Sequence, residues 1–297
     1  MLKQMLRRYR TKFRMQWTKL DFLVVETTNM CNANPPCIYC FRRFGDLKPE
    51  TMPLDLAKKI IDSCAGYARR FTPHMLGEPL LYPHIFEVLS YAKTKGMKTR
   101  MFTNASMLTK ENSWKLLKTG INHIIFSVDA DNLEDFEAIR RGLQWREVYK
   151  NILVFQQLRN SLPRSKTKTT VRVCMIPENR DKIAGIKRFW KSKVDEVSVM
   201  PEINVAPPST EKGFSSKQPV VCESPFQTLC VKPNGNIILC YRDNNELYVY
   251  GNAYRDNPYE VFMGEEMSRV REAMKCGSGY PSLCDGCMSE TVKRVER

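Results

Sequence analysis

Three thiols lie within ten residues in the stretch Cys31-Asn32-Ala33-Asn34-Pro35-Pro36-Cys37-Ile38-Tyr39-Cys40. The stretch follows the apolar run Phe22-Leu23-Val24-Val25, which is short, β-branched and ends in polar residues, and which therefore predicts a buried strand. The thiols then belong to a loop at the carboxyl end of a strand, where α/β barrels carry their chemistry. Three thiolates on one loop can hold three corners of a 4Fe–4S cluster and leave one iron open.

Two other interpretations of these thiols remain open at this point. A structural zinc site needs a fourth ligand nearby, and the three histidines of the chain all lie far from Cys40 in the sequence. A disulfide framework is not favoured, because no secretory signal is recognisable. An iron–sulfur loop is therefore the first interpretation, and zinc or unrelated thiols are the alternatives.

The composition predicts a folded protein with one large core and a smaller appendage, since the 297 residues are 42% hydrophobic and 10% aromatic. No apolar run approaches the roughly 18 residues of a membrane span. Eleven cysteines without a signal peptide indicate metal or redox chemistry in a reducing compartment. We therefore expect a cytoplasmic protein.

The net charge of +15 is concentrated at the amino end, because residues 1–19 carry seven basic side chains and no acidic one. Apolar residues recur there at helical spacing: Leu2, Leu6, Tyr9, Phe13 and Trp17. Either this helix packs on the rest of the protein, or it lies on an anionic membrane surface as a peripheral contact; nucleic-acid binding is the least favoured. The remaining charge is compatible with an anionic or sugar-linked small-molecule substrate.

From residue 20 to 200, strand-like and helix-like runs alternate, which predicts a parallel sheet with right-handed crossovers. Six such units are too few for a full barrel, so we expect a partial (β/α)6 barrel. The expected strands are Phe22–Val25, Thr72–Leu76, Lys98–Phe102, Ile121–Val128, Thr169–Met175 and Val194–Met200. The expected helices are Leu54–Arg69, His84–Lys95, Glu111–Lys118, Leu133–Arg141, Trp145–Arg159 and Lys182–Lys191.

After a proline- and serine-rich linker or active-site loop (201–221), the pattern changes to a small domain, 222–297, with a hairpin and a helix. Phe226–Lys232 and Asn236–Arg242 flank Asn234-Gly235, a strong hairpin turn, and a helix is expected at Glu260–Lys275. With a two-residue turn, Cys230 would pair with Leu239 and point away from the face that carries Cys240.

The thiol loop and Gly77-Glu78-Pro79, one strand later, together resemble the radical S-adenosylmethionine (SAM) superfamily, although five residues rather than three separate the first two thiols. The resemblance implies that Cys31, Cys37 and Cys40 hold a SAM-cleaving 4Fe–4S cluster, and that SAM binds in a pocket at the same strand ends. It also implies that a basic residue after the next helix binds the carboxylate of SAM. Arg140 is as basic as Arg141, so which of the two has this role stays open. The expected cofactor-binding residues are Tyr39, Gly77, Glu78, Pro79, Asn104, Ser127, Asp129 and Arg141.

A second set of thiols, Cys222, Cys240, Cys284 and Cys287, would saturate a zinc ion or a 4Fe–4S cluster equally well on spacing alone. The residues around it resemble the SPASM/twitch appendage of radical SAM enzymes, in the shorter form with a single auxiliary cluster. The resemblance therefore implies two 4Fe–4S clusters and SAM. It also implies an external one-electron reductant such as flavodoxin or ferredoxin.

The number of clusters and the spacing of the four auxiliary cysteines resemble those of radical SAM enzymes of aminoglycoside biosynthesis. These enzymes include a butirosin-pathway amino-cyclitol dehydrogenase and a neomycin epimerase. We therefore expect an oxidoreductase that abstracts hydrogen from a sugar or cyclitol carbon. The auxiliary cluster would accept the second electron. An epimerase with a cysteine hydrogen donor, a peptide maturase and a non-catalytic zinc scaffold are alternatives. The candidate catalytic residues are Arg172, Glu202, Arg242, Cys174 and Cys230.

Overall fold

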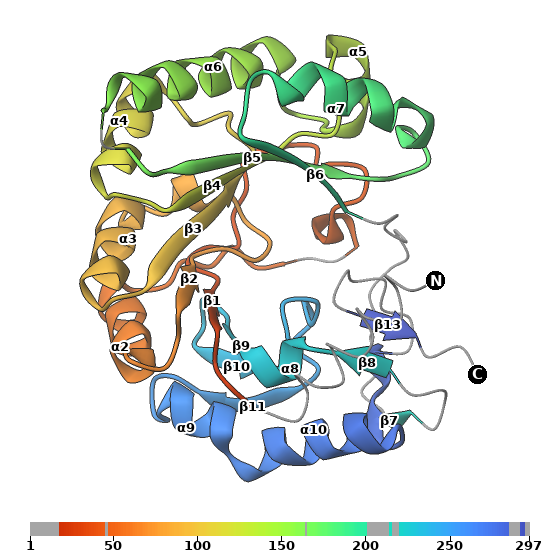
Figure 1. Cartoon of the computed structure of the whole chain (residues 1–297). Coiled ribbons are helices and arrows are strands. Elements are labelled where there is room, and N and C mark those ends of the chain that lie inside the picture. Colours follow the sequence, from red (N-terminus) through yellow and green to blue (C-terminus); the bar gives the residue numbers. More distant parts are fainter. Residues whose placement is uncertain are drawn as a thin grey trace.

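The computed structural model describes residues 18–44, 47–163, 165–200, 214–215, 220–284 and 292–294. Its centre is a curved sheet with strand order β11-β10-β9-β1-β2-β3-β4-β5-β6, and helices α2 to α7 cover its outer face (Figure 1). Strands β1 to β6 are parallel, which confirms the partial six-unit barrel. They span Phe22–Val25 (β1), Arg70–Thr72 (β2), Lys98–Thr103 (β3), His123–Ser127 (β4), Lys168–Cys174 (β5) and Glu196–Met200 (β6).

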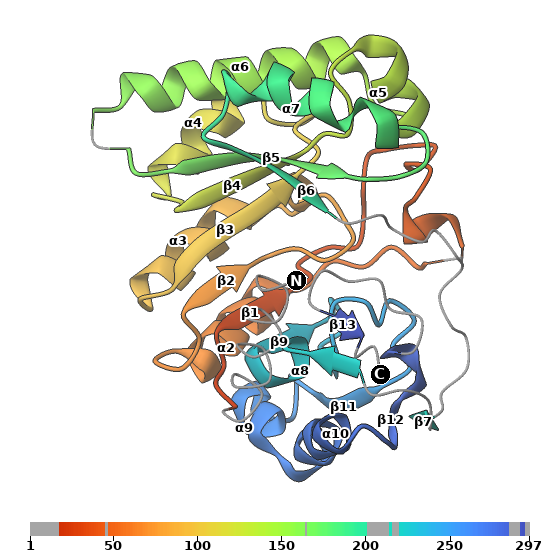
Figure 2. The same ribbon diagram turned by 45° about the vertical axis from the view of Figure 1, so that its right-hand side comes forward.

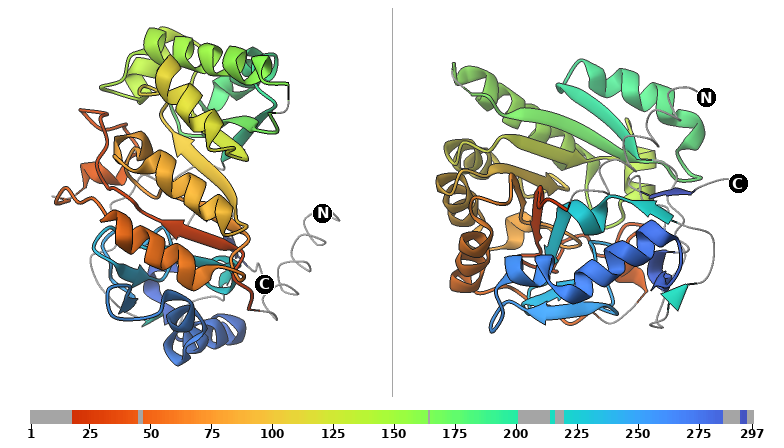
Figure 3. Two further views of the ribbon diagram at one scale, coloured as in Figure 1. Left: turned by 90° about the vertical axis from the view of Figure 1, so that its left-hand side faces the viewer. Right: turned by 60° about the horizontal axis from the view of Figure 1, so that its bottom comes forward.

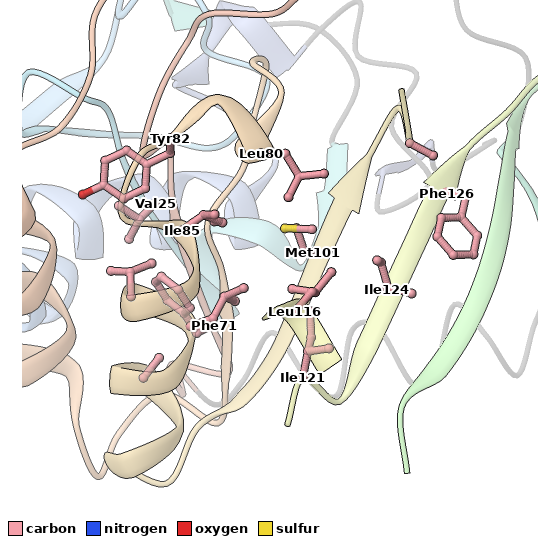
Figure 4. Close-up of a cluster of buried hydrophobic side chains, with 14 of the residues drawn as sticks. Val25, Phe71, Leu80, Tyr82, Ile85, Met101, Leu116, Ile121, Ile124 and Phe126 are labelled. Atoms are coloured by element: carbon pink, nitrogen blue, oxygen red, sulfur yellow. The ribbon is translucent and has the colours of Figure 1, made fainter. Parts of the chain in front are cut away.

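The helices of the barrel bury one face each against this sheet. In α2, the buried residues Leu56, Ile60 and Cys64 recur at helical spacing, so Cys64 is a core residue. Side chains of the strands and helices interdigitate into one core, in which Phe71, Met101 and Phe126 are fully buried (Figure 4). The helices are α2 (Leu54–Cys64), α3 (Ile85–Thr94), α4 (Lys110–Lys118), α5 (Leu133–Ile139), α6 (Trp145–Ser161) and α7 (Ile183–Lys191), with 3-10 turns at Phe41–Arg43, Pro79–Leu81 and Arg180–Lys182.

The carboxyl-terminal part is joined to the barrel by the same sheet. Strand β9 (Thr228–Val231) lies beside β1 (Figure 2) and pairs with it in parallel, with Phe22 opposite Thr228 and Val25 opposite Val231. Helices α9 (Pro258–Met263) and α10 (Glu265–Cys276) cover this part, in blue in Figure 3. The other elements are α8 (Ser224–Gln227), β7 (Phe214–Ser215), β8 (Val220–Cys222), β10 (Asn236–Ile238), β11 (Val249–Asn252), β12 (Tyr280–Pro281), β13 (Val292–Arg294) and a 3-10 turn at Ser282–Cys284.

Several predicted elements differ from the structure, and the two hairpin strands are shorter than predicted, since Phe226 belongs to α8 and β10 ends at Ile238. The second strand ends at Thr72 rather than beginning there, because Pro73 lacks the N–H group that would continue the ladder. The helix from Leu54 ends at Cys64, and the chain then turns through Gly66 at a φ of 81°. The single helix predicted over 260–275 is two helices, because the extended backbone of Gly264 separates α9 from α10.

The predicted register of the hairpin was wrong by one residue. Its loop has three residues, with Gly235 at a φ of 84°, and the Lys232 N–H donates to the Asn236 carbonyl. Cys230 therefore lies opposite Ile238, not Leu239. It still points away from Cys240, because β10 ends at Ile238 and Cys240 packs in a different cluster.

No helix in the described part of the chain is long and apolar enough to cross a membrane.

Candidate active site

The three thiols of the loop after β1 gather at the carboxyl ends of the barrel strands. Burial raises the pKa of Cys31, Cys37 and Cys40, that of Cys37 to about 11, and the thiolates of the loop repel one another electrostatically. The Cys40 N–H donates to the Cys37 carbonyl at 3.0 Å, which closes the second half of the loop. Thiols in such a position release their protons when they bind a metal.

The longer first half of this loop is supported by the end of α5. Gly142 has a φ of 76°, and a Cβ there would lie 2.4 Å from backbone atoms of Asn34. The Ile38 N–H donates to the Ile139 carbonyl at 3.0 Å, and Arg141 donates to the Pro36 carbonyl at 3.5 Å. The two additional residues are therefore accommodated by close packing of backbone on backbone.

Gly77 holds the other side of the loop. A Cβ on Gly77 would lie 2.3 Å from the Thr28 carbonyl oxygen and 2.6 Å from that of Met30, so only glycine fits. The next residue, Glu78, donates its N–H to the Met30 carbonyl at 2.7 Å. Pro79 then begins a 3-10 turn, as its fixed φ favours.

The carboxylate of Glu78 is buried and fixes Asn104 beside the first thiol. It accepts hydrogen bonds from the Thr103 hydroxyl at 2.8 Å and from the Asn104 N–H at 2.7 Å. Burial raises the pKa of Glu78 to about 7, although these hydrogen bonds oppose the shift. The Asn104 side chain donates to Asn32 Oδ1 at 2.9 Å and lies 3.8 Å from the Cys31 sulfur.

A buried network at the ends of β4 and β5 includes Tyr39, Asp129, Arg140 and Cys174. The Tyr39 hydroxyl donates to Asp129 Oδ2 at 2.5 Å, and Arg140 contacts the same carboxylate at 2.8 Å. Burial raises the pKa of the Cys174 thiol to about 12, and Tyr39 hydrogen-bonds it. A terminal nitrogen of Arg140 is thus paired with Asp129, and the Nε atoms of both Arg140 and Arg141 are buried without a hydrogen-bond partner among the described residues.

Ser127, another predicted cofactor-binding residue, is the last residue of β4 and lies opposite Arg172 of β5.

Three of the four predicted auxiliary thiols pack together in the carboxyl-terminal part. Cys222, Cys240 and Cys284 pack in one cluster with Tyr248 and Tyr250. Asp243, which follows Cys240, accepts hydrogen bonds from the N–H groups of Leu247 and Tyr248 at 2.9 Å each, and so fixes the turn. The fourth predicted ligand, Cys287, and the candidate catalytic residue Glu202 lie outside the described residues.

A cavity of about 290 Å³ opens inside the barrel, against side chains of β1, β2, β3, β5, β6 and β9. Its wall includes the catalytic candidate Arg172, together with Arg100, His74 and Tyr241, which sequence reasoning missed. His74 lies two residues beyond β2, a position where side chains reach a barrel's interior, so its place in the chain was the available signal. A larger cavity of about 560 Å³ lies at the opposite, amino ends of β4 and β5.

The other catalytic candidates do not line this cavity. Cys230 is fully buried behind its wall, in contact with Val24 and Tyr241. Cys174 belongs to the Tyr39 network described above. The guanidinium of Arg242 stacks over the ring of Phe41, 5.1 Å from its centroid, and thereby connects the two thiol-bearing segments.

Comparison with known families identifies both parts of the chain. Residues 25–189 match the radical SAM superfamily, and residues 222–288 match the SPASM iron-sulfur cluster-binding domain. The chain belongs to the radical SAM superfamily. It is therefore a radical SAM enzyme that uses SAM and iron–sulfur clusters, as the sequence predicted.

Individual relatives cover this radical SAM chain to different extents. It is 24% identical over 176 residues to a tungsten-containing aldehyde ferredoxin oxidoreductase cofactor-modifying protein of Pyrococcus furiosus, and spans about half of that relative (48%). It is also 24% identical to the S-adenosyl-L-methionine-dependent 2-deoxy-scyllo-inosamine dehydrogenase of Niallia circulans, over 93% of this chain and 96% of the relative. The crystal structure of BtrN in complex with AdoMet and 2-DOIA shares the fold, with a TM-score of 0.58 and 18% identity over 91% of this chain and 94% of BtrN.

The residues of this radical SAM chain fit the cofactors that its family implies. Soft thiolate ligands are those that iron–sulfur clusters prefer, and the Asn104 amide beside Cys31 orients the loop that would carry them. The described residues include no three cysteine, histidine or carboxylate side chains that converge on a single metal-ion position. The buried, unpartnered Nε of Arg141 at the edge of the thiol loop is the kind of donor that a carboxylate of SAM would satisfy.

Proposed function

We propose that this enzyme oxidises a hydroxyl-bearing carbon of a sugar, cyclitol or other small polar substrate, and that the auxiliary cluster accepts the second electron. The observation that carries the proposal is the similarity to a 2-deoxy-scyllo-inosamine dehydrogenase, which extends over 93% of this chain and includes both cluster-binding parts. When bound, SAM and the first cluster supply a 5′-deoxyadenosyl radical that removes a hydrogen atom from an unactivated carbon.

The protein's own residues bind the cofactors and exclude water. Cys31, Cys37 and Cys40 would hold the first cluster, and Cys222, Cys240, Cys284 and Cys287 the auxiliary one. Glu78 and Asn104 would position the methionine end of SAM, with Arg141 at its carboxylate. The cavity beside Arg172 would then hold the substrate within the barrel, shielded from solvent by the carboxyl-terminal part.

The proposal is tested by anaerobic reconstitution, addition of dithionite and SAM, and measurement of 5′-deoxyadenosine. We expect production of 5′-deoxyadenosine, and its loss in Cys31→Ala, Cys37→Ala and Cys40→Ala. The matched control is Cys276→Ala, because Cys276 is an exposed cysteine outside both sets. Equal production by the three loop variants would refute the cluster assignment, and absence of any ketone from a panel of sugars and cyclitols would refute the oxidation.

An epimerase with a cysteine hydrogen donor is the second candidate. Cys230, one of the two candidate donors, packs against Val24 and Tyr241, which line the cavity, so it could act only if these side chains moved. A turnover in deuterated water distinguishes the two reactions: epimerisation conserves the hydrogen count and adds one solvent deuterium, whereas oxidation removes two hydrogens.

The electron donor and the location of the enzyme are further parts of the proposal. A flavodoxin or ferredoxin would supply the single electron that SAM cleavage requires, in the cytoplasm. The basic residues 1–19, of which residues 1–17 lie outside the described residues, would allow peripheral contact with an anionic membrane. Co-sedimentation with anionic vesicles, compared with a variant lacking residues 1–17, tests this contact.

A further inference from the structure

Arg242 contacts both thiol-bearing segments of the chain. Its backbone N–H donates to the sulfur of Cys240 at 3.4 Å, and its guanidinium lies 5.1 Å from the ring centroid of Phe41. Phe41 directly follows Cys40, the last thiol of the loop after β1. A single residue therefore connects a predicted ligand of the auxiliary cluster to the loop of the first cluster.

The backbone on both sides of Arg242 is fixed by hydrogen bonds. The Asp243 N–H donates to the Cys240 carbonyl at 3.0 Å, and the Asp243 carboxylate holds the turn through the N–H groups of Leu247 and Tyr248. The guanidinium in turn stacks on the face of Phe41, which restricts its rotation. The positive charge of Arg242 is thus held in one place instead of being dispersed over many rotamers.

This charge lies close to the Cys240 sulfur. An extended arginine side chain places the central carbon of its guanidinium no more than about 7 Å from its own backbone nitrogen. Because that nitrogen is 3.4 Å from the sulfur, the guanidinium lies within about 11 Å of it. At such a separation, inside a protein, a unit charge still acts strongly on a redox centre.

The two charged residues that follow Cys240 have opposite effects on an electron that arrives there. A cluster held by four thiolates is negatively charged and gains a further negative charge when it is reduced, so a nearby cation raises its reduction potential and a nearby anion lowers it. The carboxylate of Asp243, which is 1% exposed, is such an anion. Arg242 supplies the opposing charge, which persists at every physiological pH, and its N–H···S hydrogen bond acts in the same direction.

We propose that Arg242 raises the reduction potential of the auxiliary cluster and so enables it to accept the second electron of the oxidation. This role rests on the oxidation proposed above and on ligation by Cys240. After one hydrogen atom has left the hydroxyl-bearing carbon, the carbon–oxygen double bond forms by loss of one proton, which passes to water, and one electron, which passes to the auxiliary cluster. Arg242 acts through that cluster and needs no contact with the substrate.

Protein-film voltammetry of the reconstituted, full-length enzyme without substrate tests this role. The signal of the auxiliary cluster is the one that remains when Cys31, Cys37 and Cys40 are all replaced by alanine. We expect Arg242→Gln to lower the potential of this cluster by about 59 mV, which corresponds to a tenfold smaller equilibrium constant for accepting one electron. Arg242→Met, a second uncharged variant that keeps an apolar stem, should give a similar shift.

Further variants separate the charge of Arg242 from its packing. Arg242→Lys keeps the charge and should restore most of the potential. Phe41→Leu keeps the charge but removes the ring that holds it, so it should lower the potential less than Arg242→Gln does. Iron content and thermal unfolding verify that each variant is loaded and folded.

The matched control is Arg269→Gln. Arg269 has the same charge and belongs to the same part of the chain, but it is exposed on α10, where it pairs with Glu265. Solvent screens such a pair, so the control should leave the potential unchanged. In turnover, Arg242→Gln should form less ketone for each 5′-deoxyadenosine than the wild type does, because its auxiliary cluster is the weaker acceptor.

The measured potential can overturn the role of Arg242 independently of the oxidation. An unchanged potential in Arg242→Gln, equal potentials in Arg242→Gln and Arg242→Lys, or an equal shift in Arg269→Gln would refute it. A potential that falls in Arg242→Gln and returns in Arg242→Lys, without a ketone from any polyol, would support the charge effect and refute the oxidation. Formation of a ketone with an unchanged potential in Arg242→Gln would do the reverse.

Discussion

Gly77 is the residue whose size decides whether the thiol loop forms. Its missing side chain allows the carbonyl oxygens of Thr28 and Met30 to lie where a Cβ would be. We predict that Gly77→Ala moves the loop and prevents assembly of the first cluster, while the auxiliary cluster still forms. Iron analysis after anaerobic reconstitution should fall from about eight to about four atoms per chain, at four per cluster.

Gly96→Ala is the control for that experiment. Gly96 has a positive φ, of 81°, which Gly77 does not have, but a Cβ there would have no neighbour within 4 Å. The control therefore includes the backbone strain of about 1 kcal/mol without the steric clash. Equal iron contents in the two variants would show that the contact with Thr28 does not determine the loop.

The buried ring of His74 leads to a prediction about how the stability of the protein depends on pH. Its pKa is lowered to about 4 in the folded protein, from about 6.5 in the unfolded chain, so the unfolded state binds more protons between these values. Its contribution to stability is therefore complete above pH 6.5 and is lost as the pH falls toward 4. The unfolding free energy of His74→Gln, measured by urea denaturation, should depend less on pH in this window, by about 1 kcal/mol or more.

Glu78 changes the pH dependence of stability in the opposite direction, over an overlapping pH range, because its pKa is raised to about 7. The comparison must therefore be made between the wild type and His74→Gln at each pH, since the slope of the wild type alone combines both groups. An unchanged difference between the two proteins from pH 4 to 6.5 would contradict the assignment.

At the scale of elements, a buried ion pair attaches the carboxyl-terminal hairpin to the barrel. Lys232, just beyond β9, lies 2.5 Å from the carboxylate of Glu26, just beyond β1, and both side chains are nearly inaccessible. We predict that Lys232→Met destabilises the protein by about 3 kcal/mol, because it leaves a buried charge without its partner. The double variant with Glu26→Gln should be less destabilised than the sum of the single changes.

Chemical denaturation of the cluster-free protein measures this effect. Lys58→Met is the matched control, because Lys58 pairs with Glu87 at the surface, where solvent screens the pair. It should change stability little. If the effects of Lys232→Met and Glu26→Gln on stability were additive, the ion pair would not couple the hairpin to the barrel.

The hairpin also shows what the sequence could and could not reveal about elements. The alternation of apolar residues located most strands and helices of the barrel, and the thiol spacing located both cysteine sets. The register of the hairpin was missed because Pro233-Asn234-Gly235 forms a three-residue loop, and a two-residue turn at Asn234-Gly235 was an equally good local choice. The pairing of β9 with β1 has no local signal, since it depends on where two distant segments meet.

The same limit applied to the candidate site. Gly77, Glu78 and Asn104 follow their strands directly, so the sequence could place them beside the thiol loop. The sequence could not decide between Arg140 and Arg141, because only folding shows that Arg140 is committed to Asp129. Arg100 was missed because a strand residue facing the interior of an open barrel resembles a strand residue facing solvent, and His74 because it follows its strand after Pro73 rather than directly.

At the scale of the whole molecule, the continuous sheet predicts that the two parts of the chain do not fold separately. Removal of residues 222–297 would expose the edge of β1, whose residues from Phe22 to Val25 pair with β9. We expect the fragment 1–221 to aggregate or to lose cooperative unfolding in calorimetry and size-exclusion chromatography. A monomeric fragment with a sharp thermal transition would contradict this expectation.

The shared ladder between β1 and β9 also constrains electron transfer. Cys31 follows β1 within a few residues, and Cys240 follows the hairpin that begins with β9. Rates of tunnelling between redox centres fall steeply with separation, and here backbone hydrogen bonds, rather than a flexible tether, would set the gap between donor and acceptor. In such an enzyme, the separation fixed by the sheet would determine the rate of the second electron transfer, independently of any opening or closing of the chain.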